Sequence, residues 1–254
     1  MNEAILSDNG WNAALHWVIE KGNLDITKKL ARLIHLYYKS FLEAMPQNFG
    51  FDASDRDSQL ALHTAVTCHF LSTVNFLVSN GVDVNNVYNA NTALHEAAIV
   101  GNIEIAAALF ESKLAVNVNV SNGFGDTALC ISSKHGHLKM IEFLLKNGAD
   151  VDAVGQYGYT ALHWAARNGY NDITKALIKN NSNVSAISVW KRTPLHIATL
   201  NNYFNVIQTL IQNGADLHAL DINDMDALDL AVMKNNYDIA SLLNLYSVRK
   251  TQNV

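Results

Sequence analysis

Seven copies of one four-residue phrase, spaced at nearly constant intervals, constrain the fold of this chain more than any other feature. The copies are Ala-Ala-Leu-His at 13–16, Leu-Ala-Leu-His at 60–63, Thr-Ala-Leu-His at 92–95, Thr-Ala-Leu-Cys at 127–130, Thr-Ala-Leu-His at 160–163, Thr-Pro-Leu-His at 193–196 and Asp-Ala-Leu-Asp at 226–229. Their fourth positions are separated by 47, 32, 35, 33, 33 and 33 residues. A period near 33 predicts a solenoid, in which each unit buries its apolar side against its neighbours. Such a stack offers a long surface and no closed catalytic pocket.

Five of the seven copies carry the signal of a helix start. In five copies the residue before the helical run has a side-chain oxygen that can cap the first turn: Thr92, Thr127, Thr160, Thr193 and Asp226. Pro194 follows at the first helical position of its copy, where a missing N–H costs nothing. Gly81, Gly148 and Gly214 stand where second helices should end, because a left-handed residue is wanted there.

The sequence resembles ankyrin repeats over roughly residues 5–245. The phrase is accompanied by a glycine six residues after its fourth position, at Gly22, Gly101, Gly136 and Gly169. The segments Asn-Gly-Val-Asp-Val-Asn at 80–85, Asn-Gly-Ala-Asp-Val-Asp at 147–152 and Asn-Gly-Ala-Asp-Leu-His at 213–218 also match the family pattern. This resemblance implies an all-α solenoid of about seven helix-turn-helix units with short β-hairpin loops.

We expect a single domain over residues 1–254. The repeats fall at about 8–54, 55–86, 87–121, 122–154, 155–187, 188–220 and 221–246, followed by a short tail at 247–254. The first repeat is longer than the others, and apolar residues at helical spacing predict that an extended helix over about 24–45 is inserted after it. We interpret this helix as a cap on the end of the stack. Docking on a partner, self-association and contact with a membrane surface are the alternatives.

Charge and composition argue against several classes of function. The net charge of −5 gives no basic face for nucleic acid. The chain opens without a basic segment and a long apolar core, and no apolar stretch approaches 18 residues, so we expect neither a signal peptide nor a membrane span. Cys68 and Cys130 lie in different repeats and are interpreted as reduced thiols. These features favour a cytoplasmic protein, and we expect a monomer.

No residue pattern indicates catalysis, a metal or a cofactor. The resemblance implies a structural role for the histidines that share one slot of the phrase: His16, His63, His95, His163 and His196. A glycine-rich phosphate loop, a nucleophile elbow and a paired-histidine zinc helix are all missing from the sequence. Cys130 occupies the histidine slot, where burial without a charged partner makes a thiol inert. We therefore expect that the protein is not an enzyme.

One modification is suggested by the resemblance. Asn85 follows Leu77, Asp83 and Val84 at the spacing that asparaginyl hydroxylases accept in ankyrin hairpins. Hydroxylation of Asn85 is therefore expected if the protein meets such an enzyme. The alternative is that Asn85 only stabilises its turn.

The resemblance also implies that a partner protein binds the concave face made by hairpin tips and first helices. By register, the candidate residues are Tyr88, Ile99, Val100, Phe124, Lys134, Tyr157, Tyr159, Arg167, Trp190, Arg192, Leu200 and Met225. Aromatic residues at loop tips have no core to fill, and such residues dominate interface energetics. The alternative is that each tip aromatic packs on its own hairpin or on the next tip. The basic residues beside the aromatic ones favour an acidic or mixed apolar–acidic peptide.

The expected function is therefore a protein–protein interaction module acting as an adaptor, a scaffold or an inhibitor. One alternative is an effector that an intracellular bacterium or parasite secretes into the cytosol of a host cell. The other is an enzyme or a regulatory subunit of one.

Overall fold

The structure, a computed structural model, describes residues 56–252, with side chains from 58 to 248. The first expected repeat and the extended helix expected at 24–45 lie outside these residues.

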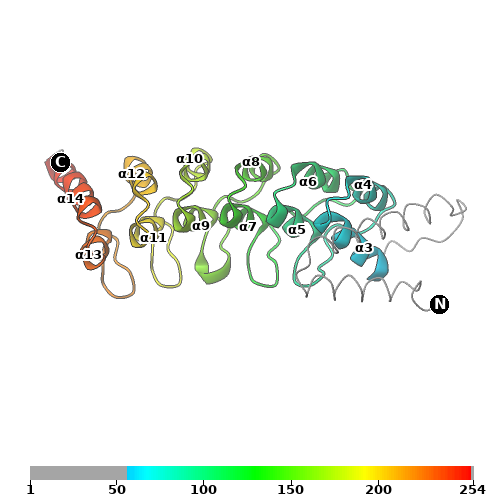
Figure 1. Ribbon diagram of the computed structural model, residues 1–254, viewed down its shortest axis with the longest axis horizontal. Coiled ribbons are helices and arrows are strands. Elements are labelled where there is room, and N and C mark those ends of the chain that lie inside the picture. Colours follow the sequence, from blue (N-terminus) through cyan, green and yellow to red (C-terminus); the bar gives the residue numbers. More distant parts are fainter. Residues whose placement is uncertain (1–55, 253–254) are drawn as a thin grey trace, which may run out of the picture.

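Twelve α-helices form six consecutive pairs within residues 56–252, as expected for an all-α repeat array. The pairs are α3 (Arg56–Thr67) with α4 (Leu71–Ser79), α5 (Ala93–Val100) with α6 (Ile103–Phe110), α7 (Ala128–His135) with α8 (Leu138–Lys146), α9 (Ala161–Asn168) with α10 (Asn171–Lys179), α11 (Pro194–Leu200) with α12 (Phe204–Gln212), and α13 (Ala227–Met233) with α14 (Tyr237–Gln252). Figure 1 shows the first helices in one row and the second helices in a parallel row. The loops between successive pairs project from the row of first helices, so loops and first helices together offer one continuous face.

The first helices begin as the sequence predicts, through a threonine and the histidine three residues later. The backbone N–H of Thr160 donates to Nδ1 of His163 at 3.1 Å, and the hydroxyl of Thr160 lies 2.9 Å from the same nitrogen. The pairs Thr92–His95 and Thr193–His196 repeat this geometry. Each pair satisfies polar groups at a helix start that lies inside the stack.

Glycine ends three of the first helices, α5, α7 and α9, where the next repeat leaves room for nothing larger. The φ angle of Gly169 is +74°, in the left-handed region, and a Cβ placed on it would lie 2.5 Å from the ring of Tyr203. Gly136 stands in the same relation to the ring of Tyr170. The glycine is therefore required both by the backbone conformation and by the close approach of the following repeat.

The core runs through the whole described stack. The leucines of five copies are almost completely buried: Leu62, Leu94, Leu129, Leu162 and Leu195. Leu228 is partly buried, and second helices contribute further aliphatic residues such as Ile141, Leu177 and Ile207 to the same cluster. Each pair of helices thus hides its apolar side only when a neighbouring pair is present.

Two expectations about the loops and the end of the chain need correction. The expected β-hairpins contain no strand within residues 56–252, but only the isolated bridges Tyr88–Asn91 and Ser121–Thr127 and a 3₁₀ turn at Gln156–Gly158. The loops turn back after three or four residues, which leaves too little chain for a ladder. The expected tail from 247 is instead part of α14, which continues to Gln252. Ser247 stands where Gly148 and Gly214 end earlier second helices, so no left-handed residue stops this one.

Candidate protein-binding surface

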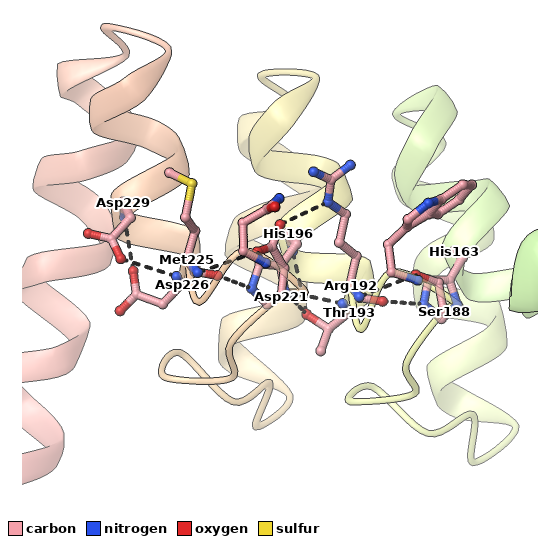
Figure 2. Close-up of polar contacts among 11 residues, drawn as sticks. His163, Ser188, Arg192, Thr193, His196, Asp221, Met225, Asp226 and Asp229 are labelled. Carbon is pink, nitrogen blue, oxygen red and sulfur yellow. Dashed lines mark hydrogen bonds and ion pairs between the residues drawn. The ribbon is translucent and has the colours of Figure 1, made fainter.

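Three of the shared histidines, His95, His163 and His196, each join their repeat to the next one. Nε2 of His163 lies 3.0 Å from the carbonyl oxygen of Arg192, and Nε2 of His196 lies 3.2 Å from that of Met225 (Figure 2). Because Nδ1 of His163 accepts from a backbone N–H, Nε2 carries the proton and donates to the carbonyl. Burial lowers the pKa of His163 to about 4, which keeps the ring neutral. These contacts support the structural role expected for the histidines.

Cys130 takes the histidine slot in repeat 122–154 and makes much weaker contacts. Its sulfur lies 3.6 Å from the carbonyl oxygen of Ala153 and 3.9 Å from that of Tyr159. Burial raises the pKa of the thiol to about 11, so it stays protonated and a poor nucleophile. Cys130 packs instead in a second small core with Tyr159, Trp164 and Ile197.

Arg192 is less free to bind a partner than the sequence suggests. Its Nε lies 3.1 Å from Oδ2 of Asp221, a carboxylate that is fully buried. Burial alone raises the pKa of Asp221, but hydrogen bonds from the backbone of Asn223, from Arg192 and from the backbone of Met225 lower it below its usual value. Figure 2 shows Arg192 reaching across to the next loop, so the guanidinium links two repeats.

Two of the three central aromatic residues are exposed, and the third is not. Tyr157 and Trp190 are 48% and 37% exposed, and their ring centres lie 5.5 Å apart. Tyr159 is only 3% exposed and contacts the rings of Tyr157, His163, Trp164 and Trp190. The prediction that Tyr159 is an exposed contact residue is therefore wrong. The ring belongs to a small buried cluster with Cys130, Trp164 and Ile197, and the two exposed rings pack against it.

Trp164 on α9 is a central residue of this face that sequence reasoning missed. The side-chain nitrogen of Lys134 lies 4.8 Å from the centre of the Trp164 ring, and the guanidinium carbon of Arg167 lies 5.9 Å from it. Both distances fit cation–π contacts. The structure thus brings Lys134 and Arg167, which were predicted separately, onto one aromatic ring. The available signal was a tryptophan at a position where other repeats have Ile131, Ile197 or Leu230.

The remaining predicted residues are spread along the face. Phe124 is the most exposed of them, at 63%. The other five are partly buried: Tyr88, Ile99, Val100, Leu200 and Met225. Tyr88 lies beside His63, at 5.4 Å between ring centres, and Ile99 packs against the main core. These residues contribute area to the face, but they do not join the aromatic group around Trp164.

Asn85 connects two consecutive turns. Its side-chain nitrogen donates to the carbonyl oxygen of Ala115 at 2.8 Å, and its side-chain oxygen accepts from the backbone N–H of Asn117 at 2.8 Å. Asn119 forms the same pair of bonds to Gly148 and Asp150 in the next repeat. Both the nitrogen and the oxygen of the Asn85 side chain therefore form hydrogen bonds within the fold. This agrees with the alternative that Asn85 stabilises its turn.

No cluster of three or more histidine, cysteine, aspartate or glutamate side chains within the described part of the chain could hold a metal ion. None of the helices in the same part has the length and apolar character needed to cross a bilayer.

Comparison with known families gives a match over most of the chain. The family of ankyrin repeats (3 copies) matches residues 37–122, 94–188 and 182–253. This is a family of repeats and not of catalytic domains.

Similar proteins come from very different organisms. The ankyrin repeat and KH domain-containing protein mask-1 of Caenorhabditis elegans is 30% identical over 154 residues, which are 58% of this chain and 6% of that protein. Alpha-latrocrustotoxin-Lt1a of Latrodectus tredecimguttatus is 30% identical over 101 residues, or 40% of this chain and 7% of the toxin. The putative ankyrin repeat protein FPV230 of fowlpox virus (strain NVSL) is 29% identical over 127 residues, or 37% of this chain and 66% of that protein. The chain thus spans under a tenth of the first two proteins.

Proposed function

The chain belongs to the ankyrin repeat family, and we propose that it is a protein–protein interaction module that holds a partner protein against the face formed by its loops and first helices. We call the central part of this face the recognition strip, defined by Phe124, Lys134, Tyr157, Arg167, Trp190 and Leu200. The exposed pair Tyr157–Trp190 carries the proposal. Neither ring fills the main core, and both are of the types that contribute most to interface energetics.

The charges on the strip favour a partner that is partly acidic and partly apolar. Lys134 and Arg167 are exposed, and within the described residues no carboxylate lies within 4.0 Å of either. Leu200 and the rings of Tyr157 and Trp190 offer apolar surface nearby along the same row of repeats. An adaptor, a scaffold and an inhibitor would all use such a surface in the same way.

The proposal includes a monomer working in a reducing compartment, as expected for the cytoplasm. Cys68 and Cys130 are both free thiols. Cys68 directly follows α3, and Cys130 lies in α7. A protein that keeps two unpaired thiols suits a compartment in which disulfides are rare.

The proposed function is tested by removing the two exposed rings. We expect that Tyr157→Ala with Trp190→Ala weakens partner binding by about 2 kcal/mol or more, because central aromatic residues act as hot spots. The measurement is affinity purification followed by mass spectrometry, with the proteins retained by the wild-type chain as reference. The matched control is Phe204→Ala with Tyr237→Ala, which removes two exposed rings from second helices. Equal retention of the same proteins by all three chains would remove the strip from consideration.

Hydroxylation of Asn85 is a second proposal about the same repeats. Asn119 makes the same hydrogen bonds but has Glu111, not leucine, eight residues before it, so it is an internal control. After incubation with an asparaginyl hydroxylase, mass spectrometry should find one added oxygen on the peptide with Asn85 and none on that with Asn119. An unmodified Asn85 peptide would contradict the proposal.

A further inference from the structure

The region around Trp164 contains three hydrogen-bond donors and lacks an acceptor. Lys134 and Arg167 place their cationic groups near the face of the Trp164 ring. The indole nitrogen of Trp164 is buried and has no hydrogen-bond partner. Buried polar groups in folded proteins almost always have a partner, so an unpaired indole N–H needs an explanation. A group that only accepts hydrogen bonds is what this site lacks.

The aromatic ring of the site is fixed before any partner arrives, and two cations lie against it. Trp164 is 5% exposed and packs against Cys130, Tyr159 and Ile197, so its ring is a fixed platform. Lys134 and Arg167 lie in the last turns of α7 and α9, where the helix dipole favours a positive charge. Side chains that are already ordered lose less entropy on binding, which increases affinity.

The surroundings neither neutralise the two cations nor add a third. His135 follows Lys134 on α7, but burial and the charges of His137 and Lys134 lower its pKa, which favours the neutral ring. No carboxylate within the described residues forms an ion pair with Lys134 or Arg167. Two cations therefore lie beside one aromatic ring without an ion-pair partner among the described residues, so an anion from outside would be attracted to both.

We propose that Lys134 and Arg167, positioned by Trp164, form a receptor for an aspartate or glutamate side chain of the bound partner, next to an apolar side chain that packs on Tyr157 and Trp190. The inference rests on the proposed function, because it names the chemistry that the recognition strip selects. A carboxylate is an acceptor with two oxygens, so it can take one hydrogen bond from each cation. Trp164 acts through the two cations and is a positioning residue.

The test uses a library of random peptides displayed on phage and selected on the full chain. We expect that selected peptides are enriched in aspartate or glutamate beside an apolar residue. Lys134→Gln with Arg167→Gln should abolish the acidic preference, retain the apolar one and weaken an acidic peptide on the order of tenfold or more. The control Lys139→Gln with Lys179→Gln changes the net charge equally, using exposed lysines of α8 and α10, and should leave the acidic preference intact.

The outcomes separate this inference from the proposed function. If the acidic preference survives in Lys134→Gln with Arg167→Gln, or if selected peptides are apolar without an acid, the carboxylate receptor is wrong while the strip still binds proteins. If acidic peptides bind equally well to Tyr157→Ala with Trp190→Ala and to the wild-type chain, the strip itself is wrong. Binding that requires phosphoserine in place of the carboxylate residue would also overturn the inference.

A spectroscopic measurement tests the role of Trp164 without relying on affinity. The indole N–H signal of Trp164 is assigned by its loss in Trp164→Phe, a variant that retains an aromatic ring. Titration with a selected acidic peptide should shift this signal, and the matching peptide with asparagine or glutamine should shift it less. An indole signal that does not respond to either peptide would contradict the assignment of the carboxylate to this site.

Discussion

Two neighbouring junctions of the stack use the same slot in opposite ways. Between repeats 155–187 and 188–220, His163 spans the junction and donates to the carbonyl of Arg192 at 3.0 Å. Between repeats 122–154 and 155–187, Cys130 occupies the slot and comes no closer than 3.6 Å to a carbonyl. The polar link there moves to Asp126, whose Oδ1 accepts from the backbone N–H of Gln156 at 2.8 Å.

The difference explains why the aromatic residues gather where they do. A cysteine is smaller than a histidine and behaves as an apolar residue when buried. Cys130 therefore leaves space and an apolar surface, which Tyr159 and Trp164 fill as a second core. Tyr157, Trp190, Lys134 and Arg167 lie on this second core. The recognition strip therefore lies at the junction where Cys130 stands in place of the histidine.

The largest expected effect compares two tyrosines that are two residues apart. Tyr159→Ala should lower the free energy of unfolding by about 3–5 kcal/mol, because it empties the centre of the second core. Tyr157→Ala should cost less than about 1 kcal/mol, because half of this side chain is already in solvent. Urea unfolding followed by circular dichroism measures both. Equal costs would mean that Tyr159 is not the centre of this core.

The second effect compares the two occupants of the slot. His163→Ala should lower the free energy of unfolding by about 2–3 kcal/mol, since it leaves the N–H of Thr160 and the carbonyl of Arg192 without their partner. Cys130→Ala removes one sulfur atom and no strong hydrogen bond, so it should cost about 1 kcal/mol. The same urea titration decides between them, and a larger cost for Cys130→Ala would contradict the comparison.

The sequence predicts the repeat fold and includes every residue of the recognition strip among its candidates, but it does not predict the second core on which they lie. Thr160 and His163 predict a helix start because capping is local, and Gly169 predicts a helix end for the same reason. The burial of Tyr159 is not local, because its ring packs against Trp164 and against Trp190 of the next repeat. Trp164 was missed because the equivalent positions of the other repeats hold residues of no common type. Nothing in the repeat pattern therefore marks this position as part of a binding site.

The smallest effect concerns how the two junctions respond to pH. Burial lowers the pKa of His163 to about 4 in the folded chain, whereas an unfolded histidine titrates near 6.5. Below pH 6.5 the unfolded state therefore binds more protons, so the stability from neutral His163 is complete above that pH and is lost as pH falls towards 4. Between pH 7 and pH 5.5 the cost of His163→Ala should shrink by about 1 kcal/mol. Cys130→Ala should cost the same at both pH values, because burial raises the pKa of that thiol to about 11. Parallel urea titrations of the two variants and the wild-type chain measure this, and a cost of His163→Ala that stays constant over the range would mean that His163 is not held neutral by burial.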